Sequence, residues 1–504
     1  MERHRQLVTQ ISSTVKAFFT NRTPYRINHG STNSTRPRPA GQGTLDISSL
    51  RNVLSVDPVQ RTALVEPNVP MDRLVEASLP HGLVPPVVME FPGITAGGGF
   101  AGTAGESSSF RHGFFDESVS KVEMVLADGE VAEVRNTEHE GGKTEERGDL
   151  FRGAAGAVGT LGLTTLLEVG LMPAKKFVKA TYRRTASVGE AIKKVEQEVD
   201  RPGNDYVDGI LFSKDHGVVV TGELTDEKPV DVKPQTFSHA KDPWFYLHVE
   251  ERTRHAQEVV EYIPLAEYFF RYDRGGFWVG KAAFDYFSFV PFNRFTRWFL
   301  DDFLHTRMLY RALHGSGESG RMIVQDLAMP FATAEKFIDY TASETRIWPL
   351  WLCPLKRRPP PTFHPVTTHP DVQDRTKIDS RMMLNIGVWG WGPSKPEQFI
   401  KANKRLEEKV RELGGMKWLY AHTYYSEKEF WEVYGNKEWY EGLRRKYKAE
   451  GLPSVWDKVH VDEKVVAGKK RSMWPWGGIV GLRKSIQSKD YMIHRNSTWK
   501  WKGE

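Results

Sequence analysis

The most informative part of the sequence is GITAGGGFAGTAGESSS, at residues 93–109. It carries six glycines, and most of its other residues are alanine, serine or threonine. Residues with little or no side chain let backbone amides approach a diphosphate closely and direct several N–H groups at it. The stretch therefore predicts a phosphate-binding loop, with a plain flexible loop as the alternative.

The residues that follow these glycines narrow the class of nucleotide site. A Rossmann fingerprint places Gly-x-Gly-x-x-Gly directly after a strand and opens a long apolar helix, with an acidic residue about 20 positions further on. Here the glycines lead into the polar residues 106–109 instead. A P-loop is excluded because no Gly-Lys-Ser/Thr comes directly after them.

Hydrophobic spacing on either side of this stretch predicts alternating strands and helices. Leu7, Ile11 and Val15 recur at helical spacing and give a helix that ends near Asn21. The pair at 128–129, Asp-Gly, suits the tight turn of a hairpin. The other expected elements are strands at 25–27, 53–56, 62–65, 83–88, 119–126, 131–134 and 163–169, and helices at 71–78 and from 149 onward. Single helices among strands predict an α+β fold.

A chain of 504 residues is long for one compact unit, so two domains and a tail are expected. Near Pro173 the sequence changes to longer helical and strand patterns that are rich in aromatic residues. After about Val466 it becomes basic and rich in tryptophan. The predicted division is an N-terminal domain at 1–173, a substrate domain at 174–465 and a C-terminal tail at 466–504.

Composition excludes several classes of protein. Apolar residues make up 39% and charged residues 27% of the chain, as is typical of globular proteins. The single cysteine, Cys353, leaves no thiol cluster for zinc or iron–sulfur, so no metal is expected and the thiol is expected to be packed. The first residues are too polar for a signal peptide, and no stretch has the roughly 20 apolar residues of a membrane span. We therefore expect an intracellular protein.

The net charge and the aromatic residues indicate which binding partners to expect. The net charge is +6, yet the basic clusters are short and lack a nucleic-acid-binding motif, so no nucleic acid is expected. Residues 277–303 interleave Phe and Trp with Lys281, Arg294 and Arg297. This pattern suits a helix in a membrane interface, and it also suits a core segment beneath a substrate pocket.

Several segments carry a resemblance to a known family. Residues 95–115 and 126–129 resemble the FAD-binding domain of the vanillyl-alcohol-oxidase, or PCMH, type. Within that superfamily the chain resembles the Δ24-sterol reductase (Diminuto) family, whose pattern recurs in order at 159–162, 172–179, 261–265 and 348–354. The likeness covers roughly residues 53–459. It implies an α+β fold in which a two-subdomain PCMH-type FAD-binding domain precedes an α+β cap domain.

The resemblance also implies where FAD binds. The first phosphate loop of the superfamily falls on the residues after His29, but it departs from the usual Gly-Gly-His-Ser pattern. Because this histidine precedes the glycine, dissociable rather than covalently bound FAD is expected. The implied cofactor-binding residues are Gly30, Ser31, Thr32, Asn33, Thr95, Ala96, Gly97, Gly98, Gly99, Phe100, Ala101, Gly102, Thr103, Ala104, Gly105, Glu106, Ser107, Gly159 and Gly162.

The family implies reduction of the Δ24 double bond of a sterol or sterol-like lipid, with NADPH as the hydride source. An isolated alkene has no carbonyl to polarise, so hydride addition also requires a proton donor. Residues 417–424 lie where related flavoenzymes bring a C-terminal strand against the flavin. Tyr420 is the first candidate for flavin contact or proton delivery, with Lys417 and His422 as neighbours. Further candidates are His248, Glu250, Tyr262 and Arg271.

Two other functions compete with sterol reduction. One keeps the FAD and makes the chain an oxidase or reductase of another terpenoid or secondary metabolite. The other is not enzymatic and treats the chain as an interaction protein at a membrane surface that retains FAD structurally. The sterol interpretation places the protein in the cytoplasm or peripherally on the endoplasmic reticulum membrane.

Overall fold

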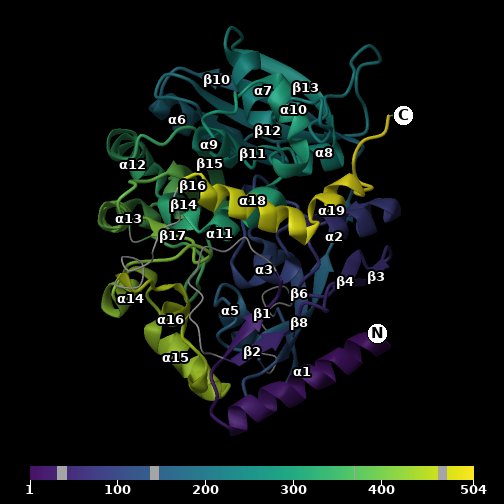
Figure 1. Cartoon of the computed structure of the whole chain (residues 1–504), viewed down its shortest axis with the longest axis vertical. Helices are drawn as coiled ribbons and strands as arrows, with labels where there is room; N and C mark the ends of the chain where they lie inside the picture. The colour runs from purple at the N-terminus through teal and green to yellow at the C-terminus, as the bar shows by residue number, and fades with distance from the viewer. Residues whose placement is uncertain (31–42, 137–146, 368, 464–473, 504) are drawn as a thin grey trace.

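The computed structural model describes residues 1–30, 43–136, 147–367, 369–463 and 474–503. Helices and strands are mixed along this part of the chain, which confirms the predicted α+β fold. Figure 1 shows a smaller sheet in the lower half of the molecule and a larger one in the upper half. The candidate site takes residues from both halves.

The smaller sheet is built from the N-terminal part of the chain. Its five antiparallel strands lie in the order β3 (Val53–Asp57), β4 (Thr62–Val65), β8 (Leu163–Gly170), β6 (Val119–Val125) and β7 (Val131–Arg135). Beside it, β1 (Tyr25–Asn28) pairs in parallel with β2 (Gly43–Asp46), and β5 (Leu83–Val84) pairs with β9 (Met172–Pro173). The N-terminal helix α1 (Glu2–Thr20) forms as predicted and buries Ile11 and Val15, but near its start it buries Val8 rather than the predicted Leu7, which is only partly buried.

The larger sheet has eight antiparallel strands. Their order is β13 (Glu258–Pro264), β10 (Phe177–Thr185), β12 (Gly217–Thr225), β11 (Tyr206–Leu211), β15 (Leu350–Lys356), β16 (Met382–Trp391), β14 (Met322–Met329) and β17 (Met416–Lys417). Successive side chains of a strand point to opposite faces. On β15, Leu350 and Leu352 therefore pack under the helices of one face, while Trp351 and Leu355 line a cavity on the other.

Helices cover both faces of this sheet. The outer face carries α6 (Val188–Val199), α12 (Phe331–Glu344) and α13 (Pro396–Glu412), whose buried residues form one apolar cluster with the strands. The remaining helices are α2 (Met71–Ser78), α3 (Ala96–Ala101), α4 (Ser109–His112), α5 (Gly148–Ala154), α7 (Phe245–Thr253), α8 (Leu265–Phe269), α9 (Val279–Tyr286), α10 (Arg294–Phe299), α11 (Thr306–Ser316) and α14 (Glu427–Tyr434). Within the described residues, none of the helices has both the length and the apolar character that a membrane span requires.

The C-terminal part of the chain returns to the N-terminal half. Helices α15 (Lys437–Lys446) and α16 (Val455–Val459) lie beside the small sheets in Figure 1, and the Tyr440 hydroxyl donates to Thr160 Oγ1 at 2.8 Å. Helix α18 (Trp476–Ser488) crosses the middle of the molecule against α11, followed by α19 (Tyr491–Arg495). The break between the two sheets falls near the predicted boundary at 173, but residues 437–459 pack on the first half, and the division into domains stays a prediction.

Three predicted elements differ in the structure. The glycine-rich stretch is not all loop, because it contains the short helix α3, which Thr95 caps by accepting a hydrogen bond from the Gly98 amide. Of the strand expected at 83–88, only β5 forms. Residues 417–424 are not a strand beyond Lys417, since β17 has only two residues.

Close packing requires glycine at Gly97. A Cβ there would lie 2.6 Å from Pro67 Cβ and 3.0 Å from the Pro67 carbonyl oxygen, which are rigid neighbours. We predict that Gly97→Ala lowers the free energy of unfolding by about 1–3 kcal/mol, measured by urea denaturation. Gly320→Ala, where nothing lies within 4 Å of the new Cβ, is the matched control and should stay within about 0.5 kcal/mol. Equal shifts for the two variants would contradict this packing.

Candidate active site

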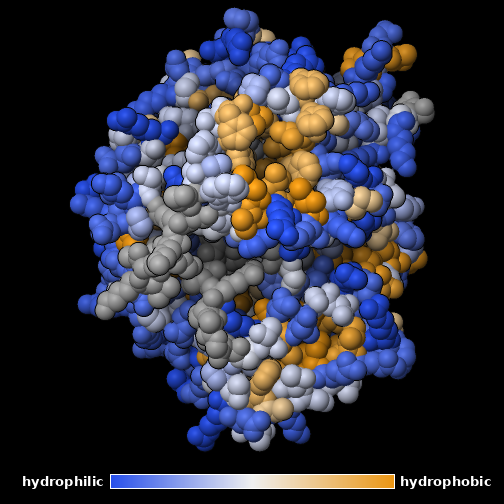
Figure 2. All heavy atoms as spheres, in the orientation of Figure 1, coloured by the Kyte–Doolittle hydropathy of each residue, from blue (hydrophilic) through white to orange (hydrophobic). Residues whose placement is uncertain are grey.

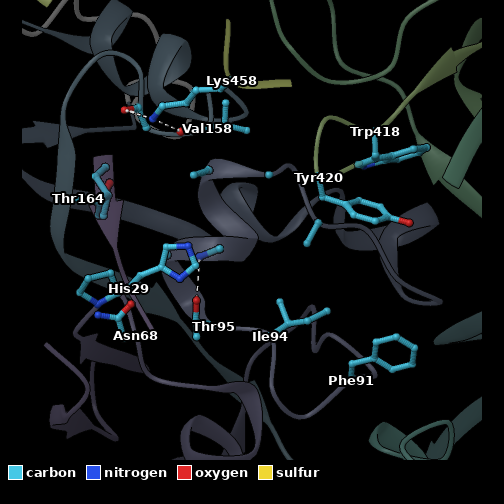
Figure 3. Close-up of a pocket in the computed structure, with 18 of the residues that line it drawn as sticks. His29, Asn68, Phe91, Ile94, Thr95, Val158, Thr164, Trp418, Tyr420 and Lys458 are labelled. Carbon is cyan, nitrogen blue, oxygen red and sulfur yellow. Dashed lines mark hydrogen bonds between the residues drawn. The ribbon is translucent and has the colours of Figure 1, made fainter. Parts of the chain in front are cut away.

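A cavity of about 360 Å³ runs between the two halves of the chain. Its lining includes the glycine-rich stretch and β1 from one half and β14, β15 and β16 from the other. Figure 3 shows His29, Asn68 and Thr164 toward one end, and Phe91, Trp418 and Tyr420 toward the other, with the glycine-rich helix between them. The cavity is therefore long, with ends of different chemical character.

The polar end suits a diphosphate. It is lined by the basic side chains of Arg26 and Lys458 and by Thr95 at the start of α3. The Lys458 ammonium is held there by the carbonyl oxygens of Val158 and Gly159, at 3.0 and 3.1 Å. Cations and backbone amides at close approach are the donors that a diphosphate requires.

Glycine lets the backbone line this end closely. Gly159 has φ +73° and Gly162 has φ +148°, both in the region that disfavours other residues. A Cβ on Gly162 would lie 3.0 Å from the carbonyl oxygen of Val125. Both glycines line the cavity, as the family pattern implies.

The predicted cofactor residues divide into two groups. Thr95, Gly97, Gly98, Ala101, Gly102, Ala104, Gly105, Glu106, Gly159 and Gly162 line the cavity, whereas Ala96, Gly99, Phe100, Thr103 and Ser107 do not and are buried behind it. Gly30 is adjacent to His29, which lines the cavity, and Gly30 itself does not. Ser31, Thr32 and Asn33 lie outside the described residues. This donor set, with a flat apolar interior beyond it, fits a dinucleotide such as FAD.

The far end of the cavity is aromatic. Phe91, Phe277 and Trp389 lie close together, with ring centroids 4.4 Å apart for Phe277 and Trp389 and 5.2 Å apart for Phe91 and Phe277. Tyr310 and Trp351 complete this part of the lining. Flat apolar walls of this kind suit the ring of a flavin and a rigid apolar substrate.

Tyr420 lies at this aromatic end. Its hydroxyl donates to Asp326 Oδ2 at 2.8 Å, and Asn385 donates to the other oxygen of the same carboxyl at 2.9 Å. Burial raises the pKa of Asp326 to about 6, and burial together with this carboxyl raises the pKa of Tyr420. The tyrosine proton is therefore directed at Asp326.

Lys417 and His422 do not line the cavity. The Lys417 ammonium is buried and bonded to Glu407 Oε1 at 2.8 Å and to the His422 carbonyl oxygen at 2.7 Å. Burial, with a smaller contribution from Lys417, lowers the pKa of His422 to about 3. Trp418 and Tyr420 both line the cavity, whereas the Lys417 side chain is bonded to Glu407 instead.

A group of buried acids forms one wall of the cavity. Glu90 and Glu106 both line it, and the Arg271 guanidinium lies 2.7 Å from Glu90 Oε1 and 3.0 Å from Asp208 Oδ2. Glu90 Oε2 has no hydrogen-bond partner in the described part of the chain. With one cation for several acids, burial favours the protonated form of a carboxyl group.

The pKa shifts follow from this arrangement. Burial raises the pKa of Glu90 to about 8, although Arg271 opposes the shift. Burial raises the pKa of Glu106 well above its usual value, and the neighbouring charge of Glu90 adds to the shift. The wall therefore holds protonated carboxyl groups at neutral pH, and a protonated carboxyl group is able to donate a proton.

The other candidate site residues lie outside the lining of the cavity. Of His248, Glu250, Tyr262 and Arg271, none lines the cavity, and His248 Nε2 is bonded to Glu261 at 2.9 Å. Arg271 acts through Glu90 and Asp208. Burial raises the pKa of the Cys353 thiol, and the sulfur is fully enclosed, in line with the packed thiol expected.

Glu90 and Asp326 were not among the site residues predicted from the sequence. A signal existed for Asp326, because an acid inside the buried apolar run of β14 is costly and marks a functional position. For Glu90 the only signal was an acid a few residues before the glycine-rich stretch. Neither shows which other acids would lie beside it in the fold.

Comparisons with known proteins agree with this geometry. A family model described as an FAD binding domain matches residues 7–135. The chain is 30% identical over 421 residues to the human Delta(24)-sterol reductase, covering 82% of this chain and 76% of that protein. It is 28% identical over 430 residues to the Arabidopsis thaliana Delta(24)-sterol reductase, covering 81% and 74%. A 140-residue match, 27% identical, links it to cytokinin dehydrogenase 7 of rice, over 27% of this chain and 25% of that one.

The buried Lys417–Glu407 pair gives a prediction about stability. Lys417→Met leaves the Glu407 carboxylate buried without its cation, and we expect a loss of about 3–5 kcal/mol in the free energy of unfolding. Lys409→Met is the matched control, because Lys409 lies on the same helix as Glu407 and pairs with Glu412 at a more exposed position. Chemical denaturation compares the variants, and similar losses would show that the buried pair has no special structural weight.

The cavity geometry, the FAD-domain match and the similarity to the human enzyme lead to one conclusion: this chain belongs to the Delta(24)-sterol reductase family.

Proposed function

We propose that this protein reduces the side-chain Δ24 double bond of a sterol, using FAD and with NADPH as the hydride source. The observation that carries the proposal is one continuous cavity whose polar, glycine-lined end suits a diphosphate and whose far end is walled by aromatic rings. The relatives named Delta(24)-sterol reductase support the substrate class. When bound, FAD would supply to the alkene the hydride that NADPH provides.

The residues of the chain bind the cofactor and orient the substrate. The glycine-rich stretch with Arg26 and Lys458 binds the diphosphate, and the aromatic end excludes water and orients an apolar substrate. Tyr420, fixed by Asp326 and Asn385, forms part of the wall at the reacting end. Because the tyrosine proton is directed at Asp326, we propose a positioning role for Tyr420 rather than proton delivery.

Addition of hydride to one alkene carbon requires a proton for the other. We propose Glu106 as the donor, since it lines the cavity and burial keeps it protonated at neutral pH. Glu90, held by Arg271, raises the pKa of Glu106 through its charge. The proton leaves the Glu106 carboxyl for the less substituted alkene carbon, positive charge develops at the more substituted carbon, and that carbon accepts the hydride. Solvent returns a proton to Glu106 after release of the product.

Turnover with a defined substrate tests the proposed reaction. Purified protein with FAD, NADPH and a Δ24-unsaturated sterol in detergent or cyclodextrin should yield the saturated side chain, detected by mass spectrometry. Under anaerobic conditions NADPH should bleach the visible absorbance of the flavin, at about 450 nm. Acid precipitation should release the flavin if it is dissociable. Peroxide formation with oxygen and no need for NADPH would instead support an oxidase acting on another terpenoid.

Isosteric variants test the proton donor. Glu106→Gln should slow sterol reduction by about 10²–10⁴-fold while NADPH still bleaches the flavin at the wild-type rate, since only the second half of the reaction needs the proton. Activity of the wild type should fall as pH rises through the pKa of Glu106, because the donor must be protonated. Glu90→Gln removes a neighbouring negative charge, lowers the pKa of Glu106 and should move this fall to lower pH. Unchanged sterol reduction in Glu106→Gln would exclude this carboxyl as the donor.

A further inference from the structure

Large apolar side chains are exposed together on one face of the molecule. Figure 2 shows apolar atoms gathered over α10 and α18 on the face turned to the viewer. The members with more than about a third of their surface exposed are Phe289, Phe295, Trp298, Phe299, Trp474, Trp476, Ile479, Val480, Leu482 and Ile486, and we call this set the aromatic face. Phe295 and Phe299 are 67% and 70% exposed, which is unusual for side chains of this size.

The two helices of the aromatic face are joined through the end of α9. The Trp474 indole N–H donates to the Tyr286 carbonyl oxygen at 2.8 Å, and the Gly478 amide donates to the Tyr286 hydroxyl at 3.1 Å. A Cβ on Gly478 would lie 2.4 Å from the Tyr286 ring, so α18 packs directly on α9. The face is therefore a fixed surface and not a set of unrelated exposed residues.

Cations surround the aromatic face. Arg294 on α10, and Arg483 and Lys489 on or next to α18, are exposed and have no carboxylate partner among the described residues. The Arg297 guanidinium lies over the Phe292 ring at 4.8 Å, with its stem along apolar surface. Aromatic side chains flanked by Arg and Lys are the composition of helices that lie in a membrane interface next to anionic lipids.

The aromatic face is on the outside of elements that wall the cavity. Phe277, just before α9, and Tyr310 on α11 line the aromatic end of the cavity, and α18 packs on α11. Trp391 at the end of β16 donates to the Ala282 carbonyl oxygen of α9 at 3.1 Å and stacks on Tyr286. One thin layer of helices therefore separates the reacting end from the aromatic face.

We infer that the aromatic face docks the protein onto an anionic membrane surface, and that the lipid substrate reaches the cavity from that side. The entry of the lipid substrate from the membrane side rests on the proposed function, whereas the docking onto the membrane does not. A second copy of the chain fits the face less well, because a twofold interface would bring the same unpaired cations toward one another. Anionic headgroups would instead neutralise them.

Vesicle flotation with the full chain tests the docking. The wild type should float with vesicles of phosphatidylcholine and phosphatidylserine, and more weakly with phosphatidylcholine alone. Phe295→Ser combined with Phe299→Ser should weaken partitioning at least about tenfold, because two large side chains no longer enter the interface. Val59→Ser combined with Val230→Ser is the matched control, since these residues are 84% and 93% exposed outside the aromatic face. Arg483→Gln combined with Lys489→Gln should remove most of the preference for the anionic vesicles.

Two outcomes would overturn the inference: no flotation of the wild type with either vesicle, or a dimer in light scattering that the Phe295/Phe299 variant dissociates. Activity separates this result from the proposed function. The Phe295/Phe299 variant should reduce sterol presented in cyclodextrin at the wild-type rate and lose reduction of sterol embedded in vesicles. If the wild type reduces sterol neither in cyclodextrin nor in vesicles, the proposed reaction is wrong, but the flotation result still stands. Equal circular dichroism spectra check that the variants fold.

Discussion

The buried guanidinium of Arg271 is the interaction on which the rest of the site depends. It joins Glu90, from the glycine-rich half, to Asp208 on β11 of the large sheet, and all three side chains are almost fully buried. The same guanidinium lies over the Tyr268 ring at 4.1 Å. A buried cation is costly unless it is paired, so this contact fixes one half of the chain against the other at the wall of the cavity. Replacing Arg271 would leave the buried Asp208 carboxylate without its cation.

The same network sets the shape and the charge of the cavity. Asp208 Oδ2 also accepts from the Tyr272 hydroxyl at 2.8 Å and the Trp351 indole at 3.1 Å, so a wall residue is oriented by the ion pair behind it. One cation cannot balance Glu90, Glu106 and Asp208 together. The imbalance keeps part of the carboxyl groups protonated, so the contact that joins the two halves also maintains the protonated form on which the proposed role of Glu106 depends.

Local sequence patterns predicted much of this fold because they depend on neighbours along the chain. The spacing of Leu7, Ile11 and Val15 predicts α1, and Asp128-Gly129 predicts the turn between β6 and β7. The pattern that failed was the strand expected beyond Lys417, because pairing with β14 lasts for only two residues. Helix α3 was missed because its glycines have low helix propensity, and close packing against Pro67 compensates for it.

The candidate site was predictable only where a motif carries it. The glycine-rich stretch identified the diphosphate end, whereas the acids Glu90, Asp208 and Asp326 come from segments far apart in the sequence. Their proximity depends on which face of each strand meets the cavity, and a shift of one residue in β14 would turn Asp326 toward the helices of the outer face. Tyr420 was found through its family position, while the direction of its proton depends on Asp326 and needed the structure.

The aromatic segment at 277–303 has a buried part and an exposed part. Phe277 and Phe284 are buried and contribute to the core beneath the cavity, whereas Phe295 and Phe299 are exposed. A hydrophobic substrate must leave one apolar environment and enter another, and each step through water costs about 25 cal/mol for every Å² of apolar surface exposed. The segment 277–303 contributes buried residues to the core beneath the cavity and exposed apolar residues to the surface. It therefore reduces the apolar surface that a substrate exposes to water on its way to the cavity. Exposed aromatic side chains are unfavourable in water, and docking of the aromatic face on lipid, as inferred above, would remove them from water.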